Sequence, residues 1–395
     1  MADNNENKVL NVPHLRFPEF SGEWDSFKLV ELGKFIGGGT PSSSNLSFWT
    51  GSIPWISSSD IKEDNINNIS ISRYITEDAI EKSATKYCPA PVILIVSRVG
   101  VGKVALSHTS LCTSQDFCNI IDIKCHPVFL SYNLLRTMKR KSREVQGTSI
   151  KGITSDELQK IRVFIPKNKD EQNKISNLLT LLDERIVTQN KIIEDLKKLK
   201  SAIIEIEYSP KDSYHSHIGG AIVQISKRNK DNHLCNVLSV SNRQGFIKQS
   251  EQFEDRNVAS DDTSNYKIVE KNDFAYNPAR INVGSIARLT KFETGIVSPM
   301  YICFRTKDCL LPEYLELFFE SRNFFYHIQK RLEGSVRLCL SYEELCNIPI
   351  VIPSIEKQKQ VDLHLSKLAQ KIDLEMKILQ FVQQQKTYLL HQMFI

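Results

Sequence analysis

The sequence predicts a mixed α/β (α+β) fold with two globular domains, each followed by a long α-helix. The two helices are expected to pack as an antiparallel coiled coil with pseudo-twofold symmetry. Three observations support this prediction: much of the chain is duplicated, each copy ends in a long stretch without Pro or Gly, and both stretches carry the same apolar seam. Such a chain has the symmetry of a dimer, which suits a ligand with two sites at a fixed separation.

The duplication is clearest where each globular domain ends. The segment that runs from Gly147 through Ile165-Pro166 to Gln172 returns as the segment from Gly334 through Ile352-Pro353 to Gln358. Further upstream, residues 99–105 align with 281–287, and 53–57 more faintly with 235–239. The scaffold residues match better than the polar residues around them, so the two copies are expected to recognise different things.

The long stretches, residues 172–207 and 357–392, have the periodicity of a coiled coil. Alternating steps of four and three residues, starting at Ile175 and Val361, meet apolar residues at seven of nine positions in each stretch. The polar exceptions fall at the same places, Gln189 and Lys200 in one copy and Glu375 and Lys386 in the other. A seam of this kind is typical of a coiled coil, and a pair of ordinary bundle helices is the alternative.

The domain boundaries follow from these patterns. We expect a disordered tail at 1–10, globular domains at 11–165 and 208–353, and coiled-coil helices at 166–207 and 354–395. Within the domains, apolar runs predict buried strands at 91–96 and 119–123, and periodic runs predict helices at 128–141 and 312–331. Residues 208–220 are expected to link the two copies.

Composition indicates a globular protein of the cytoplasm. The 395 residues are 41% apolar and 25% charged, and no apolar run reaches the ~20 residues of a membrane span. Residues 1–8 are polar and lack the apolar core of a signal peptide. The nine cysteines are scattered without metal-ligand spacing, which argues for buried or inert thiols in a reducing compartment.

Basic residues gather at matching places in the two copies. One cluster lies just before Gly147, and the other brackets Gly334; the members are Arg136, Lys139, Arg140, Lys141 and Arg143, and Lys330, Arg331 and Arg337. Either cluster alone would be read as a solvated helix face. Their recurrence beside a Gly-Ser/Thr turn favours phosphate binding, because cations and free backbone amides both hold phosphates.

These clusters and the loops after the apolar strands define the candidate DNA-binding residues. In the first copy they are Arg98, Lys103, Lys139, Arg140, Thr148, Ser149 and Lys151, and in the second Asn277, Arg280, Asn282, Ser335 and Arg337.

Catalytic patterns are weak, so no catalytic, cofactor-binding or metal-binding residue is expected. Asn277-Pro278-Ala279-Arg280 lacks the second Pro and the aromatic residue with which adenine methyltransferases hold a flipped base. Asp116 with Asp122 and Lys124 could be forced into a nuclease pattern, but such spacings arise by chance. Gly100-x-Gly102-Lys103 lacks the spacing of a phosphate-binding loop, and its counterpart Gly284-Ser285 has no Lys.

Several motifs in combination resemble the DNA specificity subunit of type I restriction-modification systems, over essentially the whole chain. They are Pro13-x-Leu15-Arg16-Phe17-Pro18-x-Phe20 with Trp24, Gly38-Gly39-Thr40-Pro41, Trp49-x-Gly51-x-Ile53-Pro54-Trp55-Ile56, Asp60-Ile61, the repeated Ile-Pro before each helix, and Asn277-Pro278-Ala279-Arg280 with Asn282-x-Gly284-Ser285. The second half lacks the Gly-Gly-Thr-Pro and Trp-x-Gly elements, so those positions carry over only to the first half.

The resemblance implies two target-recognition domains that read the halves of a split DNA sequence and are held apart by two antiparallel helices. It also implies two modification (methyltransferase) subunits as partners, with S-adenosylmethionine, and restriction (endonuclease) subunits that use ATP and Mg²⁺. Those cofactors belong to the partners. The alternatives are a coiled-coil scaffold whose globular ends bind proteins and, less favoured, a stand-alone enzyme.

Overall fold

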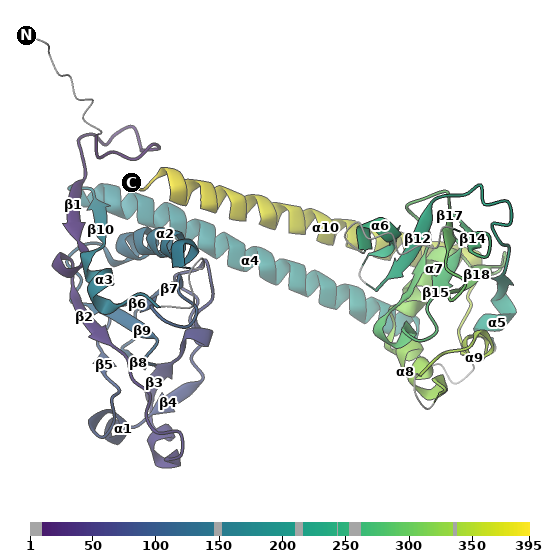
Figure 1. The fold of residues 1–395 in the computed structure, drawn as a ribbon, viewed down its shortest axis with the longest axis horizontal. Helices are drawn as coiled ribbons and strands as arrows, with labels where there is room; N and C mark the ends of the chain where they lie inside the picture. The colour runs from purple at the N-terminus through teal and green to yellow at the C-terminus, as the bar shows by residue number, and fades with distance from the viewer. Residues whose placement is uncertain (1–9, 146–151, 210–215, 243, 253–261, 335–337) are drawn as a thin grey trace, which may run out of the picture. The chain divides into compact units, whose positions relative to one another are not determined.

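The computed structural model describes residues 10–145, 152–209, 216–242, 244–252, 262–334 and 338–395 (Figure 1). These form two compact units, residues 1–190 with 377–395 and residues 191–376. Each unit contains one globular domain and one segment of each long helix.

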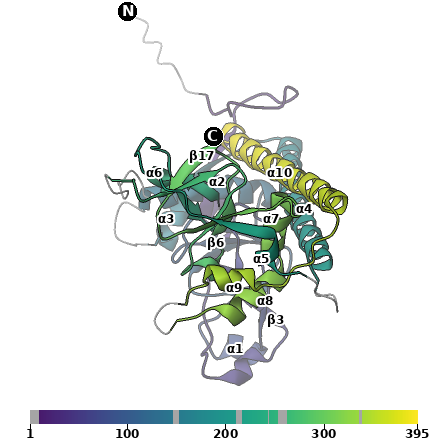
Figure 2. The same cartoon turned by 90° about the vertical axis from the view of Figure 1, so that its right-hand side faces the viewer.

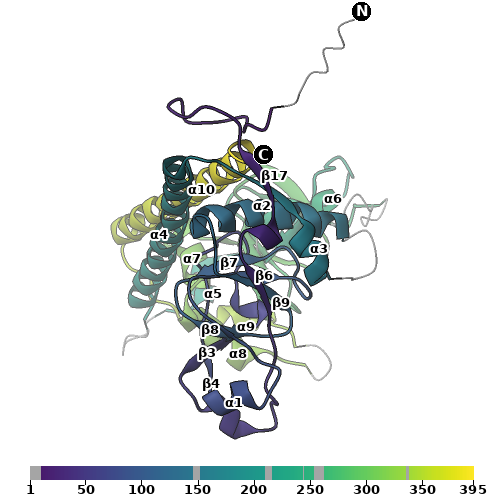
Figure 3. The same cartoon turned by 90° about the vertical axis from the view of Figure 1, so that its left-hand side faces the viewer.

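The globular domain of the first unit is built on two four-stranded sheets. Their strand orders are β2(Lys34–Gly37)-β9(Phe117–Ile121)-β6(Val92–Val96)-β7(Val104–Ser107) and β4(Arg73–Ile75)-β3(Ile53–Ile56)-β8(Leu111–Thr113)-β5(Tyr87–Cys88). A separate pair joins β1(Asp25–Lys28) to β10(Arg162–Ile165). The helices are α1(Glu77–Glu81), α2(Pro127–Val145) and α3(Ser155–Lys160), with short 3₁₀ turns at Leu29–Glu31, Leu46–Trp49 and Ser58–Asp60. Helix α2 lies against β7 (Figure 3).

The globular domain of the second unit repeats this plan. Its sheets have the orders β11(Ile222–Ile225)-β18(Ile302–Thr306)-β15(Phe274–Tyr276)-β16(Ile286–Arg288) and β13(Gly245–Lys248)-β12(Val237–Ser241)-β17(Thr294–Val297)-β14(Lys267–Glu270). The helices are α5(Ile218–Ala221), α6(Gln249–Gln252), α7(Pro312–Phe319), α8(Arg322–Arg331) and α9(Tyr342–Cys346), with a 3₁₀ turn at Ile281–Val283. Helix α5 packs against α9, and α7 against α8 (Figure 2).

The two domains share one strand topology. Taken in chain order, β2 to β9 occupy the same places in their two sheets as β11 to β18. The parallel pairs also coincide, since β3 runs parallel to β8 and β12 runs parallel to β17, while the other pairs in these sheets are antiparallel. The duplication seen in the sequence is therefore a duplication of the fold.

Alternation along the central strand creates three layers in each domain. On β6, Ile93 and Ile95 join the core that contains Phe129 and Leu134 of α2, whereas Leu94 packs with residues of the second sheet. Successive side chains of a strand point to opposite faces. An all-apolar strand such as β6 is therefore the middle layer between a helix and a second sheet.

The same layering occurs in the second domain, around β15. Phe274 and Tyr276 share a core with Tyr314 of α7. Ala275, which points the other way, packs with Leu238 and Val240 of β12. One helix layer and two sheet layers thus surround the core of each copy.

The two long helices are α4(Lys169–Glu207) and α10(Ile355–Gln392). Their existence confirms the prediction from the Pro- and Gly-free stretches. None of the predicted seam positions is exposed: each is buried or half-buried, including the polar residues Gln189, Glu375 and Lys386. The period of the sequence therefore identified the buried face of both helices.

Contacts within each unit show that the helices run antiparallel. In the first unit, Trp24 bonds to Glu171 at the start of α4 and packs against Phe394 just beyond α10, while Asp183 further along α4 pairs with Lys386 earlier on α10. In the second unit, Glu207 at the end of α4 pairs with Lys357 at the start of α10 at 3.4 Å. Both sets of contacts follow the predicted direction.

A buried glutamine anchors the start of each long helix in the same way. Gln172 donates to the Pro166 carbonyl at 2.9 Å and accepts from the His126 backbone N–H at 3.0 Å, one residue before α2. Gln358 donates to the Pro353 carbonyl at 2.9 Å and accepts from the Leu311 N–H at 2.8 Å, one residue before α7. The repeated Ile-Pro and Gln therefore join a strand end, a domain helix and a long helix.

Replacing Gln172 by Leu is expected to destabilise the first unit by about 1–3 kcal/mol, the usual cost of leaving buried polar groups unpaired. Tryptophan fluorescence during guanidinium unfolding measures this unit selectively, because all three Trp residues lie in it at 24, 49 and 55. Gln384→Leu, at an exposed position of α10 in the same unit, is the matched control. Equal unfolding midpoints for the two variants would contradict the assignment.

Two details differ from the sequence prediction. Residues 312–331 form two helices, because Ser321 caps a new helix by accepting from the Phe324 N–H at 3.1 Å. The expected linker 208–220 includes the start of α5, where the Ile218 N–H bonds to the Ile348 carbonyl.

Cys235 and Cys309 are exposed, so burial does not protect these two thiols. Within the described parts of the chain, no helix has the length and apolar character needed to cross a membrane.

Candidate nucleic-acid interface

The opening motif of the chain holds the first domain to its long helix. Glu171, whose side chain is 1% exposed, receives two hydrogen bonds from the Arg16 guanidinium at 2.7 and 2.8 Å. The Trp24 indole N–H donates to the same carboxylate at 3.2 Å. A buried carboxylate needs such donors, because an unpaired charge is costly away from water. Arg16 and Trp24 are therefore structural residues.

The Gly-Gly-Thr-Pro and Trp-x-Gly motifs are also structural. A Cβ atom at Gly38 would lie 2.0 Å from the Ser114 carbonyl oxygen, and one at Gly51 would lie 2.0 Å from that of Ile75. The carbonyl of Gly39 accepts from the Trp55 indole N–H at 3.0 Å. Only glycine permits these close approaches. These motifs therefore hold neighbouring segments of the domain close together.

Equivalent loops follow the central strands of the two domains. In the first domain the loop begins after β6, where the Val96 N–H bonds to the Lys103 carbonyl; in the second it begins after β15, where the Asn277 N–H bonds to the Ser285 carbonyl. We call these loops, residues 97–103 and 278–285, the strand loops.

Each strand loop is tied to the chain segment that follows its Gly-Ser/Thr turn. The Ile153 N–H donates to the Ser97 carbonyl at 2.8 Å, and the Leu340 N–H donates to the Pro278 carbonyl at 3.1 Å. At Gly152 a Cβ atom would lie 2.5 Å from the Ser97 oxygen. Each strand loop is therefore bonded to a described segment, which begins at Gly152 in the first domain and at Leu338 in the second.

The predicted residues of the first domain fall into two groups. Arg98 on the strand loop and Arg140 on α2 are exposed. Lys103 and Lys139 are engaged within the domain: Lys103 donates to the Ser58 carbonyl at 3.2 Å, and Lys139 forms an ion pair with Asp64. Both exposed side chains are therefore accessible to a ligand.

In the second domain, Asn277 and Arg280 meet at one pocket, whereas Asn282 on the same loop is half-buried and lies outside the pocket lining. Asn277 is 7% exposed, and its side-chain oxygen accepts from the Ala279 N–H at 3.1 Å. The other predicted residues, Thr148, Ser149, Lys151, Ser335 and Arg337, lie outside the described residues. They stay predictions.

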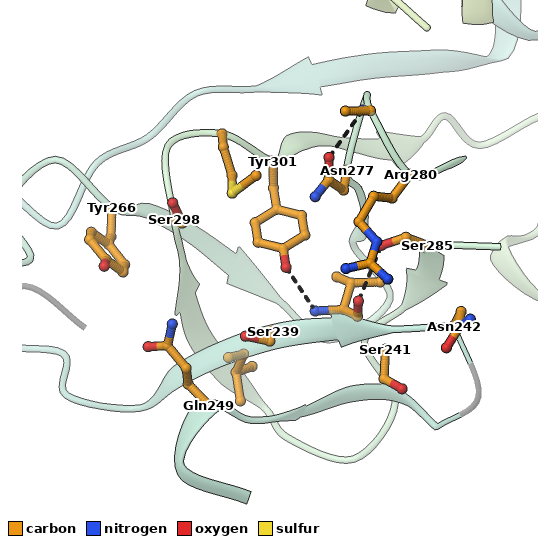
Figure 4. Close-up of a pocket in the computed structure, with 14 residues that line it drawn as sticks. Ser239, Ser241, Asn242, Gln249, Tyr266, Asn277, Arg280, Ser285, Ser298 and Tyr301 are labelled. Atoms are coloured by element: carbon orange, nitrogen blue, oxygen red, sulfur yellow. Dashed lines mark hydrogen bonds between the residues drawn. The ribbon is translucent and has the colours of Figure 1, made fainter. Parts of the chain in front are cut away.

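The pocket has a volume of about 660 Å³ and lies between β12, α6, the second strand loop and the segment from Ser298 to Tyr301. Figure 4 shows the Tyr301 ring near its centre, with Arg280 reaching from the strand loop toward β12. Fourteen residues line it: Leu238, Ser239, Val240, Ser241, Asn242, Gln249, Tyr266, Asn277, Ala279, Arg280, Ser285, Ser298, Met300 and Tyr301. Most are polar or aromatic, which gives the pocket both hydrogen-bonding groups and ring surfaces.

Sequence reasoning had identified only Asn277 and Arg280 of this set. Gln249, Ser285 and Tyr301 were missed because the pocket joins segments far apart in the chain. One signal was present, namely the replacement of Lys103 in the first strand loop by Ser285 in the second.

Comparisons with known proteins agree with the resemblance found in the motifs. The family described as "Type I restriction modification DNA specificity domain" matches residues 21–198. Over 200 residues the chain is 32% identical to the type I restriction enzyme MjaIX specificity subunit of Methanocaldococcus jannaschii, covering 48% of this chain and 45% of that protein. It is 34% identical over 192 residues to the type I restriction enzyme EcoR124I/EcoR124II specificity subunit of Escherichia coli, covering 47% and 46%.

The fold is also similar to a solved structure. The crystal structure of the type I restriction-modification system S subunit from M. genitalium matches 97% of this chain and 99% of its own, with a TM-score of 0.58 and 17% identity. At this identity the likeness establishes the fold alone. The chain therefore resembles the DNA specificity subunits of type I restriction-modification systems in sequence and in fold, while its sequence matches span about half the length of the curated relatives.

Proposed function

We propose that this protein is a sequence-specific DNA-binding specificity subunit that reads a bipartite target, one half with each globular domain. The observation that carries the proposal is the repeated strand topology with different side chains on equivalent loops. A shared scaffold keeps the two binding surfaces in the same architecture. Different loop residues, such as Gly100 and Lys103 against Asn282 and Ser285, suit two different base sequences, because base identity is read by individual side chains.

The proposal includes partners and a division of labour. The relatives are named specificity subunits of type I restriction enzymes, so we expect this chain to assemble with two methyltransferase subunits and with endonuclease subunits in the cytoplasm. S-adenosylmethionine, ATP and Mg²⁺ would be bound by those partners. In this scheme the chain itself catalyses no reaction and supplies sequence recognition.

Mapping methylated adenines in the host genome, with and without an intact copy of this gene, tests the proposal directly. The expected result is a split target whose methylation disappears when the gene is deleted. The purified chain should also bind duplexes with that target, and its affinity should fall steeply with salt, because phosphate contacts release counterions. Unchanged methylation together with salt-independent or absent DNA binding would favour a protein-binding scaffold instead.

The double variant Arg98→Ala, Arg280→Ala is expected to weaken DNA binding by about tenfold or more, because a charge-assisted contact to a base or phosphate contributes ~1–3 kcal/mol. Both side chains are exposed on equivalent strand loops. The control is Lys191→Ala, Lys198→Ala, which removes the same charge from exposed positions of α4. Equal affinities of the two double variants would contradict the placement of the DNA surface.

A further inference from the structure

The shape of the pocket in the second domain limits what it can hold. Protein elements that read the edges of stacked base pairs protrude into a groove of the DNA. A hollow instead receives a group that protrudes from the DNA. At about 660 Å³ the pocket falls in the usual range of small-molecule sites, ~300–1,000 Å³.

Comparison of the two domains shows different side chains at equivalent places around this pocket. Lys103 Nζ donates to the Ser58 carbonyl, and Ser285 Oγ donates to the Val240 carbonyl, both at 3.2 Å. These bonds are equivalent for two reasons. Lys103 and Ser285 are the last residues of their strand loops. Ser58 and Val240 each lie two residues after matching residues, Ile56 of β3 and Leu238 of β12, in the parallel pairs with β8 and β17. The first domain therefore makes this bond with a long, charged side chain, and the second makes it with a short, neutral one.

A second pair of equivalent positions, Arg73 and Gln249, also differs in side-chain charge. Arg73 lies opposite Trp55 at the edge of its sheet, where it bonds to Ser57 at 2.7 Å and pairs with Asp60. Gln249 follows β13 at the corresponding edge, and its buried side-chain oxygen has no hydrogen-bond partner among the residues that the structure describes. An unpaired buried acceptor is costly. It is explained if a ligand that enters the pocket supplies the donor.

Other groups in the pocket complement a flat heteroaromatic ligand. Asn277 uses its oxygen for the Ala279 N–H, which leaves its amide N–H₂ available to an acceptor. Tyr301, held by the Val240 N–H at 3.3 Å, offers its ring at the centre of the pocket (Figure 4). Met300, 56% exposed, and Arg280 lie at the pocket as well, and an arginine there suits a phosphate.

We propose that this pocket binds a nucleobase that has left the base stack, with Gln249 and Asn277 bonding its polar edge and Tyr301 packing against its face. Extrahelical bases are held in this manner, by amide groups on the edge and by aromatic or apolar side chains on the face. The inference rests on the proposed DNA-binding function and makes the two domains unequal. At the corresponding positions the first domain has Lys103 and Arg73, which are bonded to Ser58 and Ser57 within that domain.

Duplexes containing 2-aminopurine provide the test, since the fluorescence of this base rises when it unstacks. Once the target is known, the analogue is placed at each position of the half-target read by the second domain and of the other half. The full-length protein should raise emission several-fold at one position of the second half-target and at none of the first. A second arm titrates the four free nucleosides by calorimetry, which separates a flipped DNA base from a free nucleoside as the source.

Two variants are expected to prevent binding in the pocket in different ways. Ser285→Lys copies the residue that the twin domain tolerates at this position and should fill the pocket. Gln249→Leu removes the unpaired acceptor. Each should abolish the emission rise or the nucleoside binding. Gln224→Lys, on an exposed position of β11, adds the same charge as Ser285→Lys outside the pocket and should leave the signal intact.

The possible results distinguish a failure of the proposed DNA-binding function from a failure of the proposed nucleobase pocket. If the wild-type protein binds no duplex, the proposed function fails, and the nucleoside arm alone decides the pocket. If it binds its target but no position gains emission and no nucleoside binds, the pocket proposal is overturned while the function stands. An emission rise that both Ser285→Lys and Gln249→Leu leave unchanged also overturns it.

Discussion

Exchanging residues 11–165 for the equivalent domain of a relative is expected to change one half of the DNA target completely and to leave the other half unchanged. The physical reason is that each domain has its own core and its own pair of sheets. No strand is shared between the domains in the part of the chain that the structure describes. Methylated-adenine mapping of a strain that carries the hybrid protein measures both halves at once.

The hybrid must keep the contacts by which the first domain holds its long helices. Arg16 and Trp24 bond to Glu171, and Tyr132 bonds to Asp183, so the donor domain should carry the same residues at these positions. The reciprocal exchange of residues 208–353 is the control and should alter only the other half-target. A hybrid in which both halves change would refute the assignment of one domain to each half.

The long helices could be predicted from the sequence because their signal is local. A seam that repeats every three to four residues defines a helix and its buried face without knowledge of its partner. The same locality explains the error at 312–331, where apolar periodicity continues across the break. Serine is a preferred helix N-cap residue. Ser321 was therefore a local signal that a second helix begins at Arg322.

The sheets and the pocket could not be predicted in the same way. Strand order depends on pairing between segments far apart in the chain, such as β3 with β8, and apolar runs do not specify their partners. Lys103 was selected for its charge, yet the structure shows it bonded to Ser58. Its exchange for Ser285 was visible in the sequence, but the consequence appeared only when Gln249 and Tyr301 were found beside it.

The variant Lys386→Met is expected to destabilise the first unit by about 3–5 kcal/mol, the usual effect of leaving one partner of a buried ion pair alone. Lys386 and Asp183 have side chains 5% and 3% exposed and pair with each other. Asp183 also accepts from the Tyr132 hydroxyl at 2.7 Å. Without Lys386, the buried carboxylate keeps its bond from the Tyr132 hydroxyl but loses its cationic partner.

Burial disfavours the charged forms of both Asp183 and Lys386. Loss of hydration is the largest influence on both groups: it raises the pKa of the Asp183 carboxyl and lowers the pKa of the Lys386 ammonium, although their mutual attraction acts in the opposite direction. The pair is therefore a poor source of stability. We infer that its role is to specify which helix segments meet, as single polar residues do in coiled-coil seams.

The double variant Lys386→Met, Asp183→Asn separates the two roles, because Asn keeps an oxygen for Tyr132 while both charges disappear. We expect it to recover most of the stability lost in Lys386→Met, as measured by tryptophan fluorescence, which reports on the first unit alone. In the second unit, Lys200 of α4 takes the place that Lys386 of α10 has in the first, and it pairs at 2.6 Å with Glu320. Ala369 of α10 stands where the repeat has Asp183. The buried pair thus distinguishes the two ends of an otherwise repeated seam, and a double variant no more stable than Lys386→Met would show instead that the pair stabilises the fold.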